Sequence, residues 1–476
     1  MADAPALADP LTGGFPPASE ADWRALVDKT LGEAPFASLE KATVEGLQIE
    51  PLYAQAIASA APARAVATDR AWEVATLTVH PDLLRANREI LADLNGGAAA
   101  VIVRLDPTGK AGVAVGSTAD LGRVLDGVIL ELAPVALDAG FLGPQAADWL
   151  GATAKSSPTA LLRFHLDPLS AYAEAGVSPG PIEAHLISAA NVAARLAETY
   201  PKAQLFLASG RVVHEAGGGE ALEVAVAAAA AVAYAKALVR AGLPMAQAFG
   251  RITLGLSADA DYFLTIAKLR AARGVWARIA AACGADPTAR IEARTSRRML
   301  TAKDAWTNMI RLTAAGFGAA VGGADSVVLG NFTDALGLPT EFARRQSRNA
   351  QLVLMEEAHV GRIADPAAGS GYVEALTDEI ARAAWREFQA IEAAGGIVAA
   401  LGSGHVVKAV EAATAARPEP RIIGVTAFPP AKDTPVEVEI AAAKPVQAPS
   451  ARLPGPDSTC PPLQPMRIAE PFEAAQ

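Results

Sequence analysis

The sequence has few cysteines, few aromatic residues and no concentrated positive charge. Its two cysteines, Cys283 and Cys460, lie in unrelated contexts, which excludes a disulfide framework and a cysteine-rich metal site. Lysine and arginine number 41 against 51 aspartates and glutamates, and no basic run occurs, so we expect no nucleic-acid binding. Aromatic residues make up only 5% while alanine is abundant, which favours closely packed helices over a β-sandwich.

Long apolar runs and a secretory signal are also missing. Residues 224–239 approach membrane-spanning length, but they are mostly alanine and include Tyr234 and Lys236, so we expect a buried helix there and no membrane association. The N-terminus has no basic region followed by an apolar core, which predicts a cytoplasmic protein. With 476 residues, 51% of them hydrophobic, the chain is long enough for one large α/β barrel or two to three ordinary domains.

The middle of the chain alternates short apolar runs with longer helical patterns. Eight runs have strand character, at residues 72–79, 99–105, 128–132, 160–166, 204–208, 251–257, 290–296 and 325–329. Helical patterns lie between them, at residues 81–94, 118–125, 179–199, 220–241, 262–283 and 302–321. Eight strand–helix units in series predict an α/β fold of the (β/α)8 TIM-barrel type. An open, doubly wound sheet is the alternative. It would be expected to carry a glycine loop at its switch point, and the sequence has no such loop, which favours the closed barrel.

Both ends of the chain differ from this central pattern, which predicts three regions. Residues 1–66 form an N-terminal arm, with a helix at residues 20–31 capped by Ser19. Residues 67–417 form the barrel, and residues 418–476 form an extended tail that contains 13 of the 33 prolines. Both ends carry spaced apolar anchors without a core of their own, so we expect them to order by packing against a partner. These anchors are Trp23, Leu26, Leu52 and Tyr53 in the arm, and Ile422, Val425, Phe428, Met466, Ile468 and Phe472 in the tail.

The stretch D-P-A-A-G-S-G at residues 365–371 admits two interpretations. It is similar to the glycine loop with which methyltransferases hold S-adenosylmethionine, and such a loop should follow a buried strand. Residues 349–360 instead have the pattern of a helix end, and no acidic ribose partner follows a second strand. We therefore expect a helix before this loop and no nucleotide site.

Several motifs, in order along the chain, carry a more specific resemblance. They are the runs at residues 258–273, at 292–296 with 300–301 and 304–308, at 322–325 with 335–340, and at 348–357, followed by residues 372–377, 384–385, Phe388, 391–392 and 395–396. The chain resembles the barrel region of cobalamin-dependent acyl-CoA mutases of the methylmalonyl-CoA mutase family, and within it the small, non-catalytic subunit of a heterodimer. The resemblance also implies that the N-terminal arm packs against the partner subunit.

Residues that the resemblance marks as catalytic are replaced in this chain. Leu77 stands where catalytic chains of the family carry a tyrosine, and Val212 stands where they carry a substrate-binding histidine. His214, two positions later, would share a face with residue 212 on a strand end, although a loop histidine with structural partners is the plainer expectation. Neither leucine nor valine donates a hydrogen bond, so we expect no catalytic residue in this chain.

Other polar residues are candidates for lining the lumen or a pocket. The family's arginine motif for the substrate carboxylate is replaced by L-R-F-H-L-D-P at residues 162–168, in which Arg163 and His165 share one strand face. We expect that face to point outward, because buried polar groups in the lumen would need partners. Arg211 and Arg294 complete the candidates, together with His214.

The family's cobalamin motif D-x-H-x-x-G is absent, since His405 has no acidic residue two places before it. The resemblance implies that adenosylcobalamin is bound by a large catalytic subunit, that the pair interconverts methylmalonyl-CoA and succinyl-CoA, and that this chain stabilises its partner. It implies no cofactor and no metal in this chain. Two alternatives stay open: a barrel-only subunit of a related mutase that uses a separate cobalamin chain, and a free-standing acyl-CoA-binding pseudoenzyme.

Overall fold

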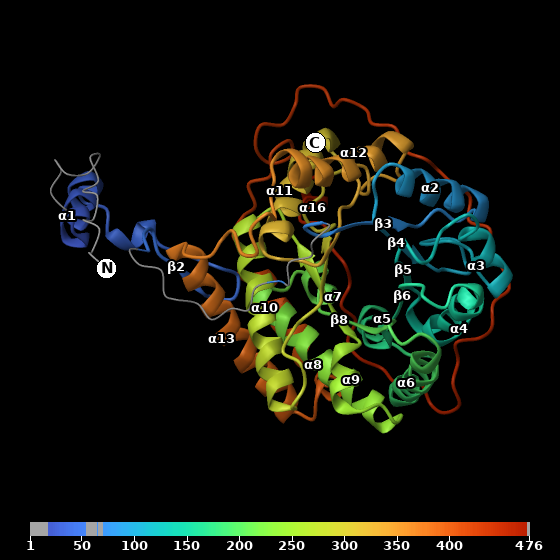
Figure 1. The fold of residues 1–476 in the computed structure, drawn as a ribbon. Helices are drawn as coiled ribbons and strands as arrows, with labels where there is room; N and C mark the ends of the chain where they lie inside the picture. The colour runs from blue at the N-terminus through green and yellow to red at the C-terminus, as the bar shows by residue number, and fades with distance from the viewer. Residues whose placement is uncertain (1–17, 54–63, 65–69, 474–476) are drawn as a thin grey trace, which may run out of the picture.

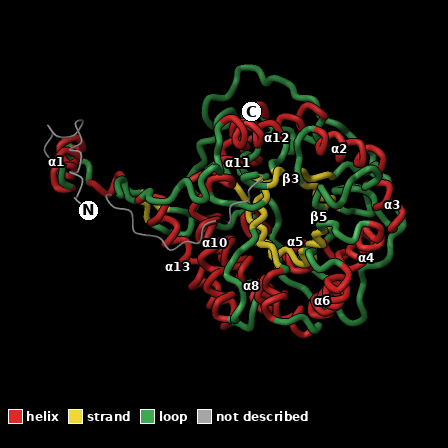
Figure 2. The backbone as a smooth tube through the Cα atoms, viewed as in Figure 1, coloured by secondary structure: helices red, strands yellow, loops and turns green. Residues whose placement is uncertain are grey.

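The computed structural model describes residues 18–53, residue 64 and residues 70–473, and the centre of this part is a closed parallel barrel. Eight strands close it in the order β10-β3-β4-β5-β6-β7-β8-β9, with helices around the outside (Figure 1). Figure 2 shows the ring of strands inside the ring of helices. The predicted TIM barrel is therefore confirmed, and the open sheet is excluded. The strands are β3 Glu73–Thr78, β4 Ala100–Arg104, β5 Val135–Asp138, β6 Leu162–Leu166, β7 Gln204–Ser209, β8 Ile252–Ala258, β9 Ile291–Thr295 and β10 Ser326–Val328.

Seven of the eight predicted strand runs overlap a barrel strand, and the third is wrong. Residues 128–132 form a loop, and the strand begins after Pro134 as β5. Both runs are apolar, so hydrophobicity alone does not separate them. Barrel strands are buried on both faces, and Val135 is fully buried whereas Leu132 is 75% exposed.

Successive residues along each strand face opposite sides, and the two sides bury different side chains. Outward-facing residues such as Val74, Val101 and Phe164 pack against the surrounding helices in the main core. Inward-facing Ala75 and Ile102 belong to a small apolar cluster of their own, which also contains Ala100, Ala136 and Val328. The barrel thus has one apolar layer inside it and a larger apolar shell outside.

Helices of the barrel region surround the strands. The predicted buried helix at residues 224–239 lies within α8, Glu220–Arg240, which is long and apolar enough to cross a membrane but is nearly three-quarters buried inside the protein. Burial of this kind is typical of a core helix. The other helices of this region are α2 Leu83–Asn95, α3 Thr118–Val124, α4 Gly143–Thr153, α5 Pro168–Ala175, α6 Ile182–Thr199, α7 Arg211–Glu215, α9 Met245–Gly250, α10 Tyr262–Ala282, α11 Asn308–Val321, α12 Glu341–Leu352, α13 Gly371–Ala393, α14 Ile397–Gly402 and α15 His405–Ala415.

The loop at residues 365–371 follows a helix, as expected. Helix α12 continues into a π-helical turn, Val353–Glu357, and no strand lies between it and the loop. Asp365 accepts hydrogen bonds from Arg270 (Nη2–Oδ2 2.9 Å), and the same guanidinium contacts Glu374 at 2.7 Å. Asp365 therefore holds the loop against α10, and Glu374 holds α13 there through the same arginine.

In the described part of the N-terminal arm, the first helix stands away from the barrel. Helix α1, Glu20–Leu31, begins after Ser19 as predicted, with Ser19 and Asp22 forming a reciprocal capping box. A short hairpin of β1, Lys41–Ala42, and β2, Gln48–Ile49, connects it toward the barrel. Figure 1 shows α1 at the far left of the molecule, and it contains no buried residue.

The proline-rich tail runs around the outside of the barrel (Figure 1, orange to red) and ends in α16, Glu470–Glu473. Its backbone donates hydrogen bonds to loops and short helices that follow the barrel strands, through Val446 N–Pro107 O, Leu453 N–Pro179 O, Cys460 N–Gly176 O, Leu463 N–Ala173 O, Met466 N–Glu215 O and Ile468 N–Arg298 O.

The expectation that the tail needs a partner surface in order to pack is wrong for this stretch. Val425, Cys460, Leu463 and Ala469 are buried against the chain's own barrel. Phe428, one of the expected anchors, is 72% exposed. Contact between the exposed tail residues and a partner stays a prediction.

Candidate functional site

Charged side chains converge inside the barrel near the carboxyl ends of its strands, where TIM-barrel enzymes place their active sites. Arg104 and Asp138 are the last residues of β4 and β5. Glu292 and Arg294 face inward from β9, as does His165 from β6. We call these five residues, together with Arg211 from α7, the lumen cluster.

The lumen cluster is joined by ion pairs that cross the barrel. Arg294 donates to Asp138 (Nη1–Oδ2 2.9 Å) and to Glu292 (Nε–Oε1 2.8 Å). Arg104 donates to the same Asp138 oxygen at 3.0 Å. Because β5 and β9 are not neighbours in the barrel, the contact between Arg294 and Asp138 spans the lumen.

The pKa values of the lumen cluster fix its charges. Burial by itself raises the pKa of Asp138, but Arg104 and Arg294 outweigh it and hold that pKa well below its usual range. Glu292 is likewise buried, yet Arg294 and His165 lower its pKa to about 2. Burial lowers the pKa of Arg211 to about 10, so it is still a cation at neutral pH. Asp138, Glu292, Arg211 and Arg294 are therefore charged at neutral pH.

His165 is the least hydrated member of the lumen cluster. Its side chain is fully buried, its backbone has φ 44°, and neither ring nitrogen has a hydrogen-bond partner among the described residues. The nearest carboxylate oxygen, Glu292 Oε2, lies 3.7 Å from Nδ1. Burial lowers the pKa of His165 to about 3 although Glu292 opposes it, so the imidazole is neutral.

Acidification is expected to destabilise the protein through His165. In the unfolded chain the histidine takes up a proton near pH 6.5, whereas in the fold it does so near 3. Stability should therefore fall between these values by up to about 1.4 kcal/mol per pH unit. His165→Asn suits the positive φ and removes this contribution. Denaturant unfolding at several pH values should show the variant's disadvantage shrinking as pH falls from 6.5 to 4. A constant difference would contradict the prediction.

Arg163 also faces the lumen, which corrects the expected outward orientation. It lies near the amino end of β6 and donates to Glu73 of β3 (Nη2–Oε1 2.6 Å). These strands are three positions apart in the barrel, so this ion pair crosses the lumen too. Arg163 and His165 are buried polar groups on one inward face, and Glu73 supplies the partner that Arg163 requires.

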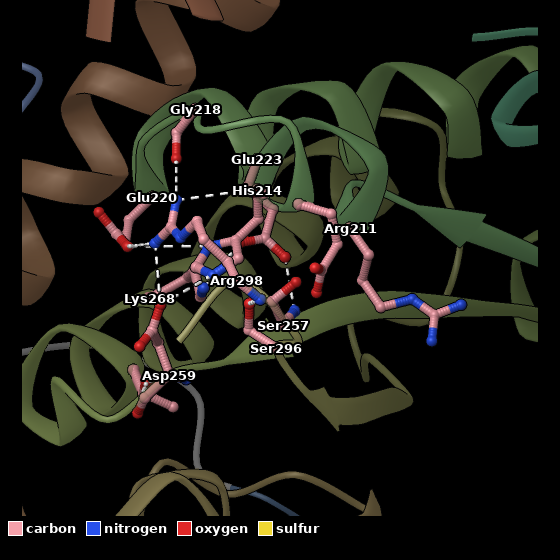
Figure 3. A network of polar contacts seen from close by, with 12 residues as sticks. Arg211, His214, Gly218, Glu220, Glu223, Ser257, Asp259, Lys268, Ser296 and Arg298 are labelled. Carbon is pink, nitrogen blue, oxygen red and sulfur yellow. Dashed lines mark hydrogen bonds and ion pairs between the residues drawn. The ribbon is translucent and has the colours of Figure 1, made fainter. Parts of the chain in front are cut away.

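His214 lies beside the lumen cluster, in a second buried network that Figure 3 shows from close by. It is on the short helix α7, so the expectation of a strand end is wrong. Its Nε2 lies 3.1 Å from Asp259 Oδ2, and its Nδ1 lies 3.3 Å from Glu223 Oε2. The side chain is fully buried between these two carboxylates. This is a histidine with structural partners, on a helix.

Lys268 and Arg298 complete this network, which we call the α8 cluster: His214, Glu220, Glu223, Asp259, Lys268 and Arg298. Lys268 Nζ lies 2.6 Å from Glu223 Oε2, and Arg298 Nη2 lies 2.9 Å from Asp259 Oδ2. Burial raises the pKa of Glu223, but Lys268 and His214 lower it to about 2. In Figure 3 the guanidinium of Arg211 points away from His214. The α8 cluster therefore links α7, α8 and α10, whereas Arg211 belongs to the lumen cluster.

Leu77 and Val212, which the family resemblance places at catalytic positions, lie in apolar surroundings that suit them. Leu77 packs on the apolar layer inside the barrel, beside Ala75 and Ile102. Val212 is on α7 and packs against the main core. Among the described residues, no group of histidine, cysteine and carboxylate side chains is arranged to hold a metal ion.

Sequence reasoning missed the acidic halves of both clusters. Glu292 was present in the E-A-R-T-S motif, two positions before Arg294, and period-2 alternation could have placed both on one face. Asp138 was missed because the third strand was placed too early. Glu223, Asp259 and Lys268 were scattered in sequence, and no spacing connects them.

Comparison with known proteins shows one family. The family model described as methylmalonyl-CoA mutase matches residues 95–452. The chain is 39% identical over 469 residues to the methylmalonyl-CoA mutase small subunit of Streptomyces virginiae, which covers 91% of this chain and 74% of that protein. It is also 39% identical over 398 residues to the probable methylmalonyl-CoA mutase small subunit of Mycobacterium tuberculosis, covering 78% of this chain and 62% of that protein.

A relative without the small-subunit name is less similar. The methylmalonyl-CoA mutase of Cereibacter sphaeroides is 30% identical over 462 residues, which cover 87% of this chain and 65% of that protein. Two of these three relatives therefore have more than a third of their length outside the match. The higher identity favours the small subunits.

Proposed function

Because the chain belongs to the methylmalonyl-CoA mutase family, we propose that it is the small subunit of a heterodimeric methylmalonyl-CoA mutase and is itself catalytically inactive. Its large partner would carry out the interconversion of methylmalonyl-CoA and succinyl-CoA. The observation that carries the proposal is the Arg294–Asp138 ion pair, which crosses the barrel near the carboxyl ends of its strands, where TIM-barrel enzymes place their active sites. A second pair, Arg163–Glu73, crosses the barrel near the amino ends of its strands.

Adenosylcobalamin, which would supply the radical chemistry of the holoenzyme, is assigned to the partner in this proposal. The residues at the barrel mouth do not fit it. Asp138 is already paired with Arg104 and Arg294. Leu77 and Val212 are apolar, whereas the family resemblance places a tyrosine near the cofactor and a histidine on the substrate at these positions. We assign no step of the reaction to this chain.

The arm supports a role in assembly. No residue between 18 and 53 is buried, and Leu26 of α1 is 65% exposed. Trp23 meets Phe36 edge-on at 5.9 Å, while Arg24 lies over the same ring. An amphipathic segment held away from its own barrel is suited to a partner surface, and burying it there would offset the ordering cost.

The barrel-only catalytic subunit is disfavoured by the same observations. Such a subunit would need the tyrosine and the histidine that Leu77 and Val212 replace. Separating Arg163 from Glu73 to open the lumen would leave the buried guanidinium of Arg163 without this partner, at a cost of several kcal/mol.

Co-expression tests the proposal directly. We expect this chain, purified alone, to contain no adenosylcobalamin and to show no mutase activity. With a large methylmalonyl-CoA mutase subunit from the same organism, it should form a complex with the mass of one copy of each chain. The double variant Leu77→Tyr, Val212→His should leave turnover per complex unchanged, because misplacement by about 1 Å costs roughly 100-fold in rate.

Three measurements decide the outcome: the absorption spectrum, the mass of the complex and the turnover. Stoichiometric cobalamin in the isolated chain would overturn the assignment of the cofactor. A large subunit that stays uncomplexed would overturn the heterodimer. Doubled turnover in the double variant would show that the barrel of this chain is competent after all.

A further inference from the structure

The tail passes over the loop after β3 without being bonded to it along its backbone. Before this stretch, Glu439 pairs with Leu338 through two backbone hydrogen bonds, Glu439 N–Leu338 O at 2.8 Å and Leu338 N–Glu439 O at 3.2 Å. After it, Val446 N donates to Pro107 O at 2.8 Å. Residues 440–445, which we call the tail arch, have no backbone hydrogen bond to the described part of the barrel. The tail arch is therefore held only at its two ends.

A cavity of about 380 Å³ lies beneath the tail arch. Its inner wall is formed by the loop after β3 and by α2, and its outer wall by the tail. Ala441 and Ala442 line it with single methyl groups, whereas the bulkier Ile440 beside them is 93% exposed. The tail thus leaves this space unfilled. Its volume is within the range of about 300–1,000 Å³ that is typical of small-molecule sites.

The two carboxylates at the cavity already have partners within the protein. Asp82 caps α2, because its side chain accepts from Arg85 N at 2.9 Å. Glu439 lies 2.9 Å from Arg85 Nη2, and the same guanidinium contacts Glu89 at 3.3 Å. The acidic groups are therefore used in holding the helix and the tail in place.

Two cations at the cavity, one on each wall, lack such partners. Arg88 of α2 makes no hydrogen bond or ion pair with the described residues. Lys444 of the tail arch has its Nζ 3.9 Å from Asp82 Oδ2, which is beyond hydrogen-bond distance. His80 adds a neutral donor, since its Nδ1 accepts from Asp82 N at 3.1 Å and the ring hydrogen is therefore on Nε2. The groups free to bind a ligand here are thus all donors.

We propose that this cavity binds a small organic phosphate, with the phosphate group between Arg88 and Lys444. Phosphate oxygens accept charge-assisted hydrogen bonds from guanidinium and ammonium groups. Pro81, Ala441 and Ala442 offer apolar contacts to the organic part. A bare ion would leave most of the cavity empty, because a molecule of water takes only about 30 Å³.

This site is separate from the lumen cluster, with which it shares no residue. It therefore goes beyond the proposed function and does not depend on it. A ligand that touches both walls would also join α2 to the tail arch. Binding should consequently slow hydrogen exchange in the tail as well as release heat.

Isothermal titration calorimetry of the full-length chain at fixed ionic strength tests the site, with ribose 5-phosphate as the probe. We expect this probe to bind at least about tenfold more tightly than ribose, which lacks the phosphate, and than inorganic phosphate, which lacks the organic part. Arg88→Gln and Lys444→Gln should each weaken binding by about tenfold. Ala441→Leu should weaken it too, because leucine fills the cavity without changing its charge.

Arg123→Gln is the matched control, since Arg123 is 64% exposed on α3 and does not line the cavity. It should bind the probe as the wild type does. Hydrogen exchange of residues 439–447 should slow with ribose 5-phosphate and stay unchanged with ribose.

Three results would overturn the proposal. The first is the absence of any binding of ribose 5-phosphate at millimolar concentration. The second is wild-type affinity in Arg88→Gln, because the phosphate would then be held elsewhere. The third is equal affinity for inorganic phosphate, which would show that the organic part makes no contact. None of these results bears on the heterodimer, which is tested by co-expression.

Discussion

Replacing Lys268 with methionine is expected to lower the free energy of unfolding by about 3–5 kcal/mol. Lys268 is fully buried, and its Nζ lies 2.6 Å from Glu223, whose carboxylate also has no exposed surface. Methionine preserves most of the volume but leaves the Glu223 charge without its closest cation. His214 stays at 3.3 Å and offsets part of the loss, so the lower end of this range is expected.

The chain provides a matched control for Lys268 in another lysine–glutamate pair. Lys236 and Glu392 are 2.9 Å apart, but the lysine side chain is 58% exposed. Lys236→Met should therefore cost less than about 1 kcal/mol. Denaturant unfolding followed by tryptophan fluorescence and circular dichroism measures both variants. Equal losses would show that the α8 cluster contributes no more than a surface ion pair.

Replacing Leu463 with alanine is expected to release the end of the tail from the barrel. Leu463 is 1% exposed, and its backbone N–H donates to Ala173 O at 2.8 Å. Truncation of a buried leucine to alanine costs about 2–5 kcal/mol. The tail has no core of its own, so this loss should appear as local detachment. Trypsin cleavage after Arg467, which is paired with Glu473, should become at least about tenfold faster.

Leu132→Ala is the control for the tail, because Leu132 is 75% exposed in a loop before β5. It should leave the cleavage rate after Arg467 unchanged. The fragments are identified by mass spectrometry, so cleavage at other exposed sites in the tail is counted separately. If Leu463→Ala is cleaved no faster than Leu132→Ala, the tail is held by contacts other than this side chain.

The α8 cluster and the tail contacts explain what the sequence alone could not foresee. Residues 418–476 were expected to rely on a partner because their proline content and lost periodicity exclude a core. These features exclude a core within the segment, but they do not exclude burial against the barrel beside it. Leu463 and Val425 are buried in that way, and the local sequence pattern carries no information about such contacts.

The inward direction of Arg163 shows a similar limit. Alternation along β6 correctly placed Arg163 and His165 on one face, since that follows from strand geometry. The inward orientation of this face depends on Glu73, which is 90 residues away. Its carboxylate pairs with Arg163 and offsets the desolvation of the buried guanidinium. No local pattern connects these two positions.

The sequence by itself determined the barrel, because eight apolar runs between helical patterns have few other ways to bury both faces of each strand. It also determined the boundaries of α1 and the apolar character of positions 77 and 212, since these depend on local residues alone. The tertiary structure decided which charges meet. Ion pairs across the lumen and the capping of α8 by Glu45 join residues that lie far apart in the chain. Their partners are selected by the closure of the barrel and by the low solvation inside it, and neither can be read from neighbouring residues.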